Sequence, residues 1–404
     1  MNRSSTSSEY SLDELIEDGL VTLGRGKVIS KKDLAATPGP YPVYSSARMN
    51  DGKFGEYGLY MFDEELITWS VDGGGRLFHR PRHKFSVTNV GGTLRINNTD
   101  RLSYRFLYHY LTLEHSRVRF DWVKKAHPSI IRKIYEGIPL IGMPEQERIV
   151  AILDEAFEAI DTAIANTEKN LSNTEELFQS ILEQQFNNLD SGDSEWQQTA
   201  LGEVSETIKR GISPKYVETG GIAVINQKCI RDHAINMDLS RRHNLSEKKV
   251  NPERYVKVGD VLVNSTGMGT LGRVAQVREE PLEPTTVDTH VTIVRPEPGR
   301  FVDAFFGWML VHVENEITNS GAGASGQTEL ARSTLANAIK VSFPIDHQAQ
   351  KLVVSVLDEA NDSVQGLRDG LTLKLAGLEE LKQSVLEKAF SGELTDSVLE
   401  EAGV

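Results

Sequence analysis

Basic side chains next to glycines give this chain its clearest chemical signal. Residues 76–84 read Arg-Leu-Phe-His-Arg-Pro-Arg-His-Lys and directly follow a triple glycine. Arginine and lysine neutralise phosphates, arginine can bind guanine through two hydrogen bonds, and glycine lets a backbone approach a phosphate closely. The run predicts a loop that contacts a nucleic-acid backbone. The alternative is a solvated basic face that binds nothing.

Shorter polar segments offer the same chemistry. Residues 124–127 and 241–244 each carry two neighbouring cations, and residues 226–231 place two amides and two cations after an apolar run. Asparagine and glutamine can read adenine, but both are also ordinary loop residues. With further loop positions, the candidate contact residues are Ser45, Ser46, Arg48, Arg76, His79, Arg80, Arg82, Lys84, Lys124, Lys125, His127, Asn226, Lys228, Arg231, Arg241, Arg242, Ser265, Thr266, Thr270 and Gln327.

The sequence carries no signature of catalysis or metal binding. It lacks the Gly-x-x-x-x-Gly-Lys-Ser/Thr loop of ATP motors and the Asn/Asp-Pro-Pro-aromatic tetrapeptide of amino-methyltransferases. Residues 267–272 match Gly-x-Gly-x-x-Gly, but residues 273–277 read as a strand and not as a pyrophosphate-binding helix, so we expect a strand-to-strand loop. His79 and His83 are four residues apart, yet Pro81 between them disfavours a helix. We predict no catalytic residue and no metal site.

A repeat marks the elements that must position these segments. Leu153-Asp154-Glu155-Ala156 recurs 204 residues later as Leu357-Asp358-Glu359-Ala360, and residues 175–183 recur as residues 379–387 at the same offset. A constant offset over about forty residues indicates duplicated rigid elements, because loops gain and lose residues easily.

Both copies of the repeat have the periodicity of a helix, with apolar residues at steps of three and four. Each copy predicts a helix of about 40 residues, roughly 60 Å long, which is too long to bury its apolar seam in one small core. We therefore expect the two helices to pair as an antiparallel coiled coil, since the domain between them must return the chain. The predicted seam and subunit-docking residues are Ile149, Leu153, Ile160, Phe178, Val353, Leu357, Val364 and Leu381.

The remaining segments read as two globular α+β domains. Both contain short apolar runs bounded by turn residues, among them residues 65–70, 84–89, 222–225, 260–263, 273–277 and 290–294. The predicted organisation is a first globular domain at 1–140, a first long helix at 141–190, a second globular domain at 196–344 and a second long helix at 345–395.

Length, charge and cysteine content fit this organisation. A chain of 404 residues with 39% hydrophobic residues can fill two or three domains. The net charge of −14 divides into +3, −10, 0 and −7 for residues 1–145, 146–195, 196–344 and 345–404. The acidity therefore belongs to the helices, as a solvated surface or as a docking surface. Cys229 is the only cysteine, and we expect a cytoplasmic protein without a disulfide, signal peptide or membrane span.

The junctions between domain and helix are also repeated. The apolar exits Ile138-Pro139-Leu140 and Val341-Ser342-Phe343-Pro344 are followed by Gln146 and Gln350 and then by the Leu-Asp-Glu-Ala motifs. With residues 381–394, these motifs resemble the conserved regions of the specificity subunit of type I restriction-modification systems, and the match covers the whole chain. Residues 41–46 and 258–263 resemble segments of that family's target recognition domains. Residues 343–348 depart from the usual proline-rich second exit.

The resemblance implies a non-catalytic subunit with two target recognition domains, each reading one half of a bipartite, asymmetric site in double-stranded DNA. It also implies that the helices dock two methyltransferase subunits and that motor-nuclease subunits join them. This chain would bind no cofactor, whereas its partners would use S-adenosylmethionine, ATP and Mg²⁺. On the residues alone two alternatives remain: a coiled-coil scaffold whose globular domains bind protein, and an enzyme with an unrecognised active site.

Overall fold

The computed structural model describes residues 8–46, 50–72, 74–118, 125–187, 195–302, 304–321 and 329–394. The chain forms two compact units, one of residues 1–168 with 372–404 and the other of residues 169–371. Each unit combines one globular domain with a part of both long helices. Within the described ranges, no helix is both long enough and apolar enough to cross a membrane.

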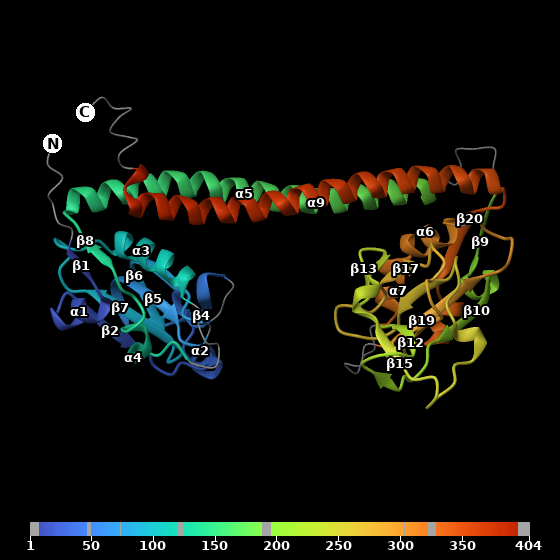
Figure 1. Ribbon diagram of the computed structural model, residues 1–404, viewed down its shortest axis with the longest axis horizontal. Helices are drawn as coiled ribbons and strands as arrows, with labels where there is room; N and C mark the ends of the chain where they lie inside the picture. The colour runs from blue at the N-terminus through green and yellow to red at the C-terminus, as the bar shows by residue number, and fades with distance from the viewer. Residues whose placement is uncertain are drawn as a thin grey trace, which may run out of the picture. The chain divides into compact units, whose positions relative to one another are not determined.

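A six-stranded sheet forms the centre of the first domain (Figure 1). Its order is β2 (Val21–Arg25), β7 (Gly91–Ile96), β5 (Phe62–Ser70), β6 (Leu77–Val87), β3 (Tyr41–Tyr44) and β4 (Lys53–Tyr57). β3 and β6 are parallel, and the other neighbours are antiparallel. The helical elements of this domain are α1 (Leu12–Glu17), α2 (Lys31–Ala36), η1 (Asn50–Gly52), α3 (Tyr104–Arg117) and α4 (Pro128–Ile131).

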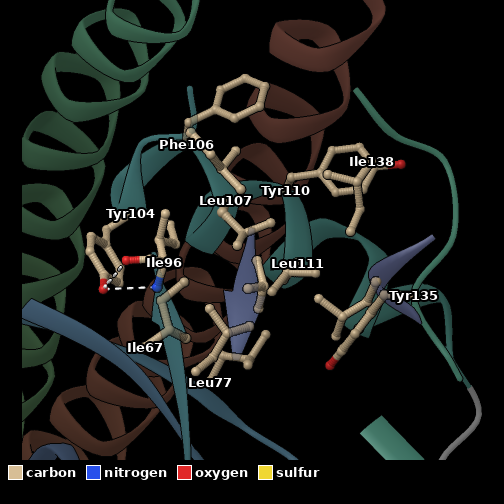
Figure 2. Packing of buried hydrophobic residues seen from close by; sticks show 14 of the residues in the cluster. Ile67, Leu77, Ile96, Tyr104, Phe106, Leu107, Tyr110, Leu111, Tyr135 and Ile138 are labelled. Carbon is tan, nitrogen blue, oxygen red and sulfur yellow. Dashed lines mark hydrogen bonds between the residues drawn. The ribbon is translucent and has the colours of Figure 1, made fainter. Parts of the chain in front are cut away.

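The core of the first domain lies between the sheet and α3. Ile67 and Ile96 from the sheet belong to one buried cluster with Leu107 and Leu111 from α3 (Figure 2). The hydroxyl of Tyr104 accepts a hydrogen bond from the Ile96 amide at 2.9 Å, which ties the start of α3 to the end of β7. The buried apolar area and this polar tie together fix the helix on the sheet.

The second domain contains two four-stranded sheets. One has the order β10 (Ser205–Arg210), β19 (Val291–Pro296), β16 (Val261–Asn264) and β17 (Val274–Gln276). The other has the order β11 (Tyr216–Val217), β15 (Arg241–His243), β12 (Ile222–Ile225) and β18 (Thr285–Val287). The remaining elements are η2 (Leu201–Val204), β13 (Ile230–Arg231), β14 (Ala234–Ile235), η3 (Met237–Leu239), η4 (Pro252–Arg254), α6 (Phe305–His312), α7 (Glu314–Ser320) and α8 (Arg332–Asn337).

The two domains share one topology. The order β2, β7, β5, β6 in the first matches β10, β19, β16, β17 in the second. The end of the long β6 also corresponds to β18, because it pairs in parallel with β3 as β18 pairs with β12. Each has a glycine whose backbone touches the end of a distant strand, β6 or β18: a Cβ would lie 1.9 Å from Val87 O at Gly26 and 2.0 Å from Val287 O at Gly211. Each exit also pairs with the first strand of its domain, β8 (Ile138–Leu140) with β1 (Ser8–Tyr10) and β20 (Lys340–Pro344) with β9 (Trp196–Ala200).

A buried ion pair joins two strands of the second domain. Asp260, which is fully buried, accepts two hydrogen bonds of 2.7 Å from the guanidinium of Arg295. The Lys257 amide donates to the same carboxylate at 2.8 Å. The pairing raises the pKa of Arg295, and these hydrogen bonds oppose the rise that burial imposes on the pKa of Asp260. The Val258-Gly259-Asp260 segment therefore has a structural role in this domain.

The long helices are α5 (Met143–Asn187) and α9 (His347–Ser391), each of 45 residues. In the first unit Lys382 of α9 donates to Asp161 of α5 at 2.6 Å, and in the second unit Arg368 of α9 pairs with Glu175 of α5 at 3.4 Å. A residue later in α5 thus pairs with a residue earlier in α9, so the two helices are antiparallel. The predicted fold class, two α+β domains separated by helices that pair as an antiparallel coiled coil, is confirmed.

Seven of the eight predicted seam residues are buried, with exposures between 0% and 7%. Leu381 is the exception, because 48% of its side chain is exposed, and its assignment to the seam is wrong. The neighbouring Leu386 and Ala389 fill the core at that level. Leu177, at the equivalent position of the first copy, is 50% exposed, so this repeated leucine faces outward in both helices.

The apolar runs predicted as strands lie in or overlap β5, β6, β12, β16, β17 and β19. The basic run at 76–84 is not a loop, because all of it except Arg76 belongs to β6. Pro81 is tolerated there because the ladder shifts register at this point. Residues 241–243 also form a strand, β15. The division at 140, 190, 196 and 344 stays a prediction, since both units combine domain and helix.

Candidate nucleic-acid interface

One buried glutamine fastens each domain to its long helix. Gln146 accepts a hydrogen bond from the Ser103 amide at 2.8 Å and donates to the carbonyls of Arg101 and Ile141 at 2.9 and 2.8 Å. No surface of Gln146 is exposed, so its three bonds replace the water that it loses.

Gln350 repeats this arrangement in the second unit. It accepts from the Val302 amide at 2.9 Å and donates to the carbonyls of Pro344 and Arg300 at 2.9 and 3.3 Å. Gln350 is also fully buried. The same side chain therefore orients each helix start against the loop before α3 or α6.

The repeated aspartates contact the domains about two turns farther along the helices. Asp154 binds the guanidinium of Arg105 from α3, and Asp358 accepts from Arg278 at 2.7 Å and from the Trp308 indole at 2.8 Å. The leucines before them, Leu153 and Leu357, are fully buried in the helix seam. The Leu-Asp-Glu-Ala motif is thus repeated because it faces both the partner helix and the domain.

A polar cleft of about 750 Å³ lies between α3 and the helix pair of the first unit. Charged side chains that line the cleft form ion pairs with each other, Arg105 with Asp154 and Lys382 with Asp161. His109 in this cleft is 5% exposed, and burial lowers its pKa to about 3. The imidazole is therefore neutral near pH 7 and is a packing group.

The first domain presents a polar edge made of two loops. Ser45 and Ser46 follow β3, and residues 71–76 connect β5 to β6. Ser46 accepts from the Asp72 amide at 3.3 Å, and Ser70 donates to the Ser46 carbonyl at 3.4 Å, so the loops touch each other. Arg76 is exposed where the second loop enters β6.

The second domain builds the same edge from different residues. Asn226 and Gln227 follow β12, and the loop of residues 265–273 connects β16 to β17. Asn264, in the position of Ser70, donates to the Gln227 carbonyl at 3.0 Å. The amide of the residue before each loop, Ser70 or Asn264, donates to the carbonyl of Arg76 or Arg273, at 3.0 and 2.9 Å.

The predicted contact residues divide between this edge and other surfaces. Ser45, Ser46, Arg76, Asn226, Lys228, Ser265, Thr266 and Thr270 lie in the two edges. Lys228 is exposed, whereas Ser265 is 1% and Asn226 8% exposed, because both support the loops from within. Arg48, Lys124 and Gln327 lie outside the described residues. Arg273 also belongs to the edge, although it is not among the predicted contact residues. The sequence could have indicated it, because both loops end in Gly-Arg followed by an apolar residue.

Arg80 does not reach the surface. It is 5% exposed and donates to the Asp51 carbonyl at 2.5 Å and to the Thr68 hydroxyl at 3.1 Å, while its guanidinium lies 3.6 Å from the centre of the Tyr44 ring. Burial lowers the pKa of Arg80. Its expected role as a direct contact is replaced by support of the segment after β3.

Several other basic candidates lie on β6 and β15, outside the two loop edges. On β6, the Arg82 side chain is 78% exposed, Lys84 lies 4.8 Å from the Tyr60 ring, and His79 binds Glu65 at 2.6 Å. In the second domain, Arg241 stacks 3.3 Å from the centre of the Tyr216 ring.

Three of the remaining basic candidates form ion pairs with acidic side chains. Arg242 is bonded to Glu283, Arg231 lies near Asp232 at 3.6 Å, and Lys125 pairs with Asp72 at 3.1 Å. His127 caps α4. Among the residues that the structure describes, no group of three His, Cys, Asp or Glu side chains is placed to hold a metal.

Two domains of one topology, each with a polar loop edge and each fastened to a long helix by the same glutamine, define a duplicated recognition protein. The model of the type I restriction modification DNA specificity domain matches residues 9–171 and 193–371. The chain therefore belongs to the family of type I restriction-modification specificity subunits, which are non-catalytic components of their complexes.

Curated relatives agree with this family. A putative type I specificity subunit N-terminus of Mycoplasma pneumoniae is 36% identical over 138 residues, which cover 32% of this chain and 70% of that protein. The specificity subunit of the type I restriction enzyme MpnII from the same species is 32% identical over 176 residues, 41% of this chain and 52% of that protein. The latter alignment thus spans about half of the relative's length.

A solved structure shares the fold. It belongs to a study of the structural basis of complex assembly and conformational transition of the type I R-M system. Its TM-score is 0.64 at 18% identity, and the alignment covers 95% of this chain and 97% of that chain.

Proposed function

We propose that this chain is the DNA-reading subunit of a type I restriction-modification complex and that each domain reads one half of a bipartite target. The observation that carries the proposal is the pair of equivalent loop edges. They occupy the same place in one topology, yet they present serines and Arg76 in the first domain and Gln227, threonines and Arg273 in the second. Different side chains on one scaffold are expected to read different bases, so the halves should be unlike.

The helices supply the docking surface in this proposal. Leu177 and Leu381 occupy equivalent positions and are 50% and 48% exposed, so each unit presents an apolar side chain in the same repeated surroundings. The segments 146–195 and 345–404 carry net charges of −10 and −7, which would attract a basic partner surface. Two equivalent surfaces suit two copies of one partner, the methyltransferase subunit.

The chemistry of the complex would then belong to the partners. The methyltransferase subunits would use S-adenosylmethionine to methylate adenine, and motor-nuclease subunits would use ATP and Mg²⁺ to cleave DNA. This chain would bind none of these cofactors. Because its ligand is the DNA of the cell, it would act in the cytoplasm.

Exposed cations on β6 should contribute phosphate contacts. Replacing Arg82 and Lys84 with alanine is expected to weaken DNA binding by the assembled modification complex and to flatten its salt dependence. Each lost phosphate contact reduces the slope of log affinity against log salt concentration by about 0.9, so the double variant should lose about 1.8. Titrating a target duplex at several salt concentrations measures this slope.

A matched variant removes the same charge elsewhere in the domain. Arg132 and Lys133 follow α4, and Arg132 is paired with Asp13 of α1. Replacing both with alanine should leave the slope at the wild-type value. Equal slopes for all three proteins would show that β6 faces solvent and does not contact phosphate.

A further inference from the structure

Met268 lies in the loop between β16 and β17, and 95% of its surface is exposed. Its neighbours Gly267 and Gly269 have left-handed backbones, with φ of +108° and +76°. These glycines turn the chain sharply on both sides of the methionine. The large apolar side chain therefore stands on a narrow tip with almost no packing inside the chain.

The tip is held in place by its own hydrogen bonds. The Gly267 carbonyl accepts from the amides of Thr270 and Leu271 at 3.2 and 3.0 Å, and the Gly272 amide donates to the Asn264 carbonyl at 2.8 Å. Leu271 is 9% exposed and anchors the loop in the core of the second domain. A Cβ at Gly267 would lie 2.2 Å from the Thr270 hydroxyl, so that position requires glycine. Met268 projects from an ordered support.

Polar and cationic groups of the candidate interface surround the tip. Arg273 donates to the Gly269 carbonyl at 3.0 Å, and Thr270 donates to the side-chain oxygen of Gln227 at 3.3 Å. In the first domain, the described part of the equivalent tip consists of Gly74 and Gly75, with φ of +77° and +78°. The apolar tip therefore distinguishes the second domain from the first.

We propose that Met268 is a wedge that inserts between two base pairs of the half-site read by the second domain. The proposal rests on the DNA-reading function proposed above and deepens it. Apolar side chains inserted between base steps unstack them and kink the duplex, and the energy required depends on the step. Pyrimidine–purine steps unstack most easily, so the second half-site should favour TA or CA/TG at the wedge. Contact with bases would also remove the methionine from water.

The test uses duplexes that carry the target of the complex, with 2-aminopurine at successive positions of the second half-site. In the complete modification complex, wild-type protein is expected to raise the fluorescence at one step, because unstacked 2-aminopurine is bright. Met268→Gly should abolish the rise and weaken specific binding by roughly tenfold or more. Met268→Leu should keep both, since leucine fills a similar volume.

Leu282 provides a matched control. It is an apolar residue with 106% exposure in the connection between β17 and β18. Leu282→Gly should bind and unstack DNA as the wild type does. An unchanged signal in Met268→Gly, or specific wild-type binding without any bright step, would overturn the wedge alone. A wild-type complex without sequence-specific binding would overturn the DNA-reading function as well.

Discussion

Replacing Asp260 with alanine is expected to destabilise the second domain by about 3–5 kcal/mol, because it leaves the Arg295 guanidinium buried without its counterion. Arg295 is 8% exposed and has its two bonds of 2.7 Å to this carboxylate. The pair ties the start of β16 to β19, and β16 leads into the loop of residues 265–273. Hydrogen exchange followed by mass spectrometry should show much faster exchange in these strands, while β5 and β7 of the first domain keep their protection.

The first domain offers a matched control. Arg95 occupies the position of Arg295 and binds Glu64 through two hydrogen bonds of 2.6 Å, but these side chains are 43% and 36% exposed. Water replaces a partner at such a site, so Glu64→Ala should cost about 1 kcal/mol or less. Equal effects of the two substitutions would show that burial does not make the Asp260 pair important.

Replacing Gln350 with alanine should release the start of α9 from the second domain. The change leaves the Val302 amide and the carbonyls of Arg300 and Pro344 without their partner, which we expect to cost about 2–4 kcal/mol. Faster hydrogen exchange is expected in residues 300–302 and in the first turns of α9. Recognition of the half-site read by this domain should also weaken.

Gln348 lies on the same first turn of α9 but is exposed, so Gln348→Ala should leave exchange and recognition unchanged. Gln146→Ala should affect the first domain in the way that Gln350→Ala affects the second. If Gln350→Ala exchanges like the Gln348 variant, the buried glutamine does not hold the joint.

The long helices were predictable because their periodicity lies within each repeat. Steps of three and four residues identify Leu153 and Leu357 as core residues without knowledge of any other segment. Leu381 was misplaced because Leu378, Leu381 and Val385 are all apolar at steps of three and four, and only the packing of the paired helices decides which of them turn inward.

The candidate interface was less predictable because its contacts join distant segments. Arg80 is buried by Tyr44 and the Asp51 carbonyl, which precede it by about thirty residues or more. The sequence around a basic residue in a strand does not show whether distant segments bury it. The equivalence of the two loop edges depends on strand pairing and is weak in the sequence. Tertiary contacts outside the local pattern decided both features.

Mapping methylated adenines across the genome of a host tests the proposed DNA-reading function most directly. The comparison is between cells without this chain, cells with it, and cells with residues 197–340 exchanged for the equivalent domain of a relative. We expect a bipartite motif that appears only with the chain and changes in one half after the exchange. Methylation that is the same with and without the chain, or an exchange that changes both halves, would contradict it.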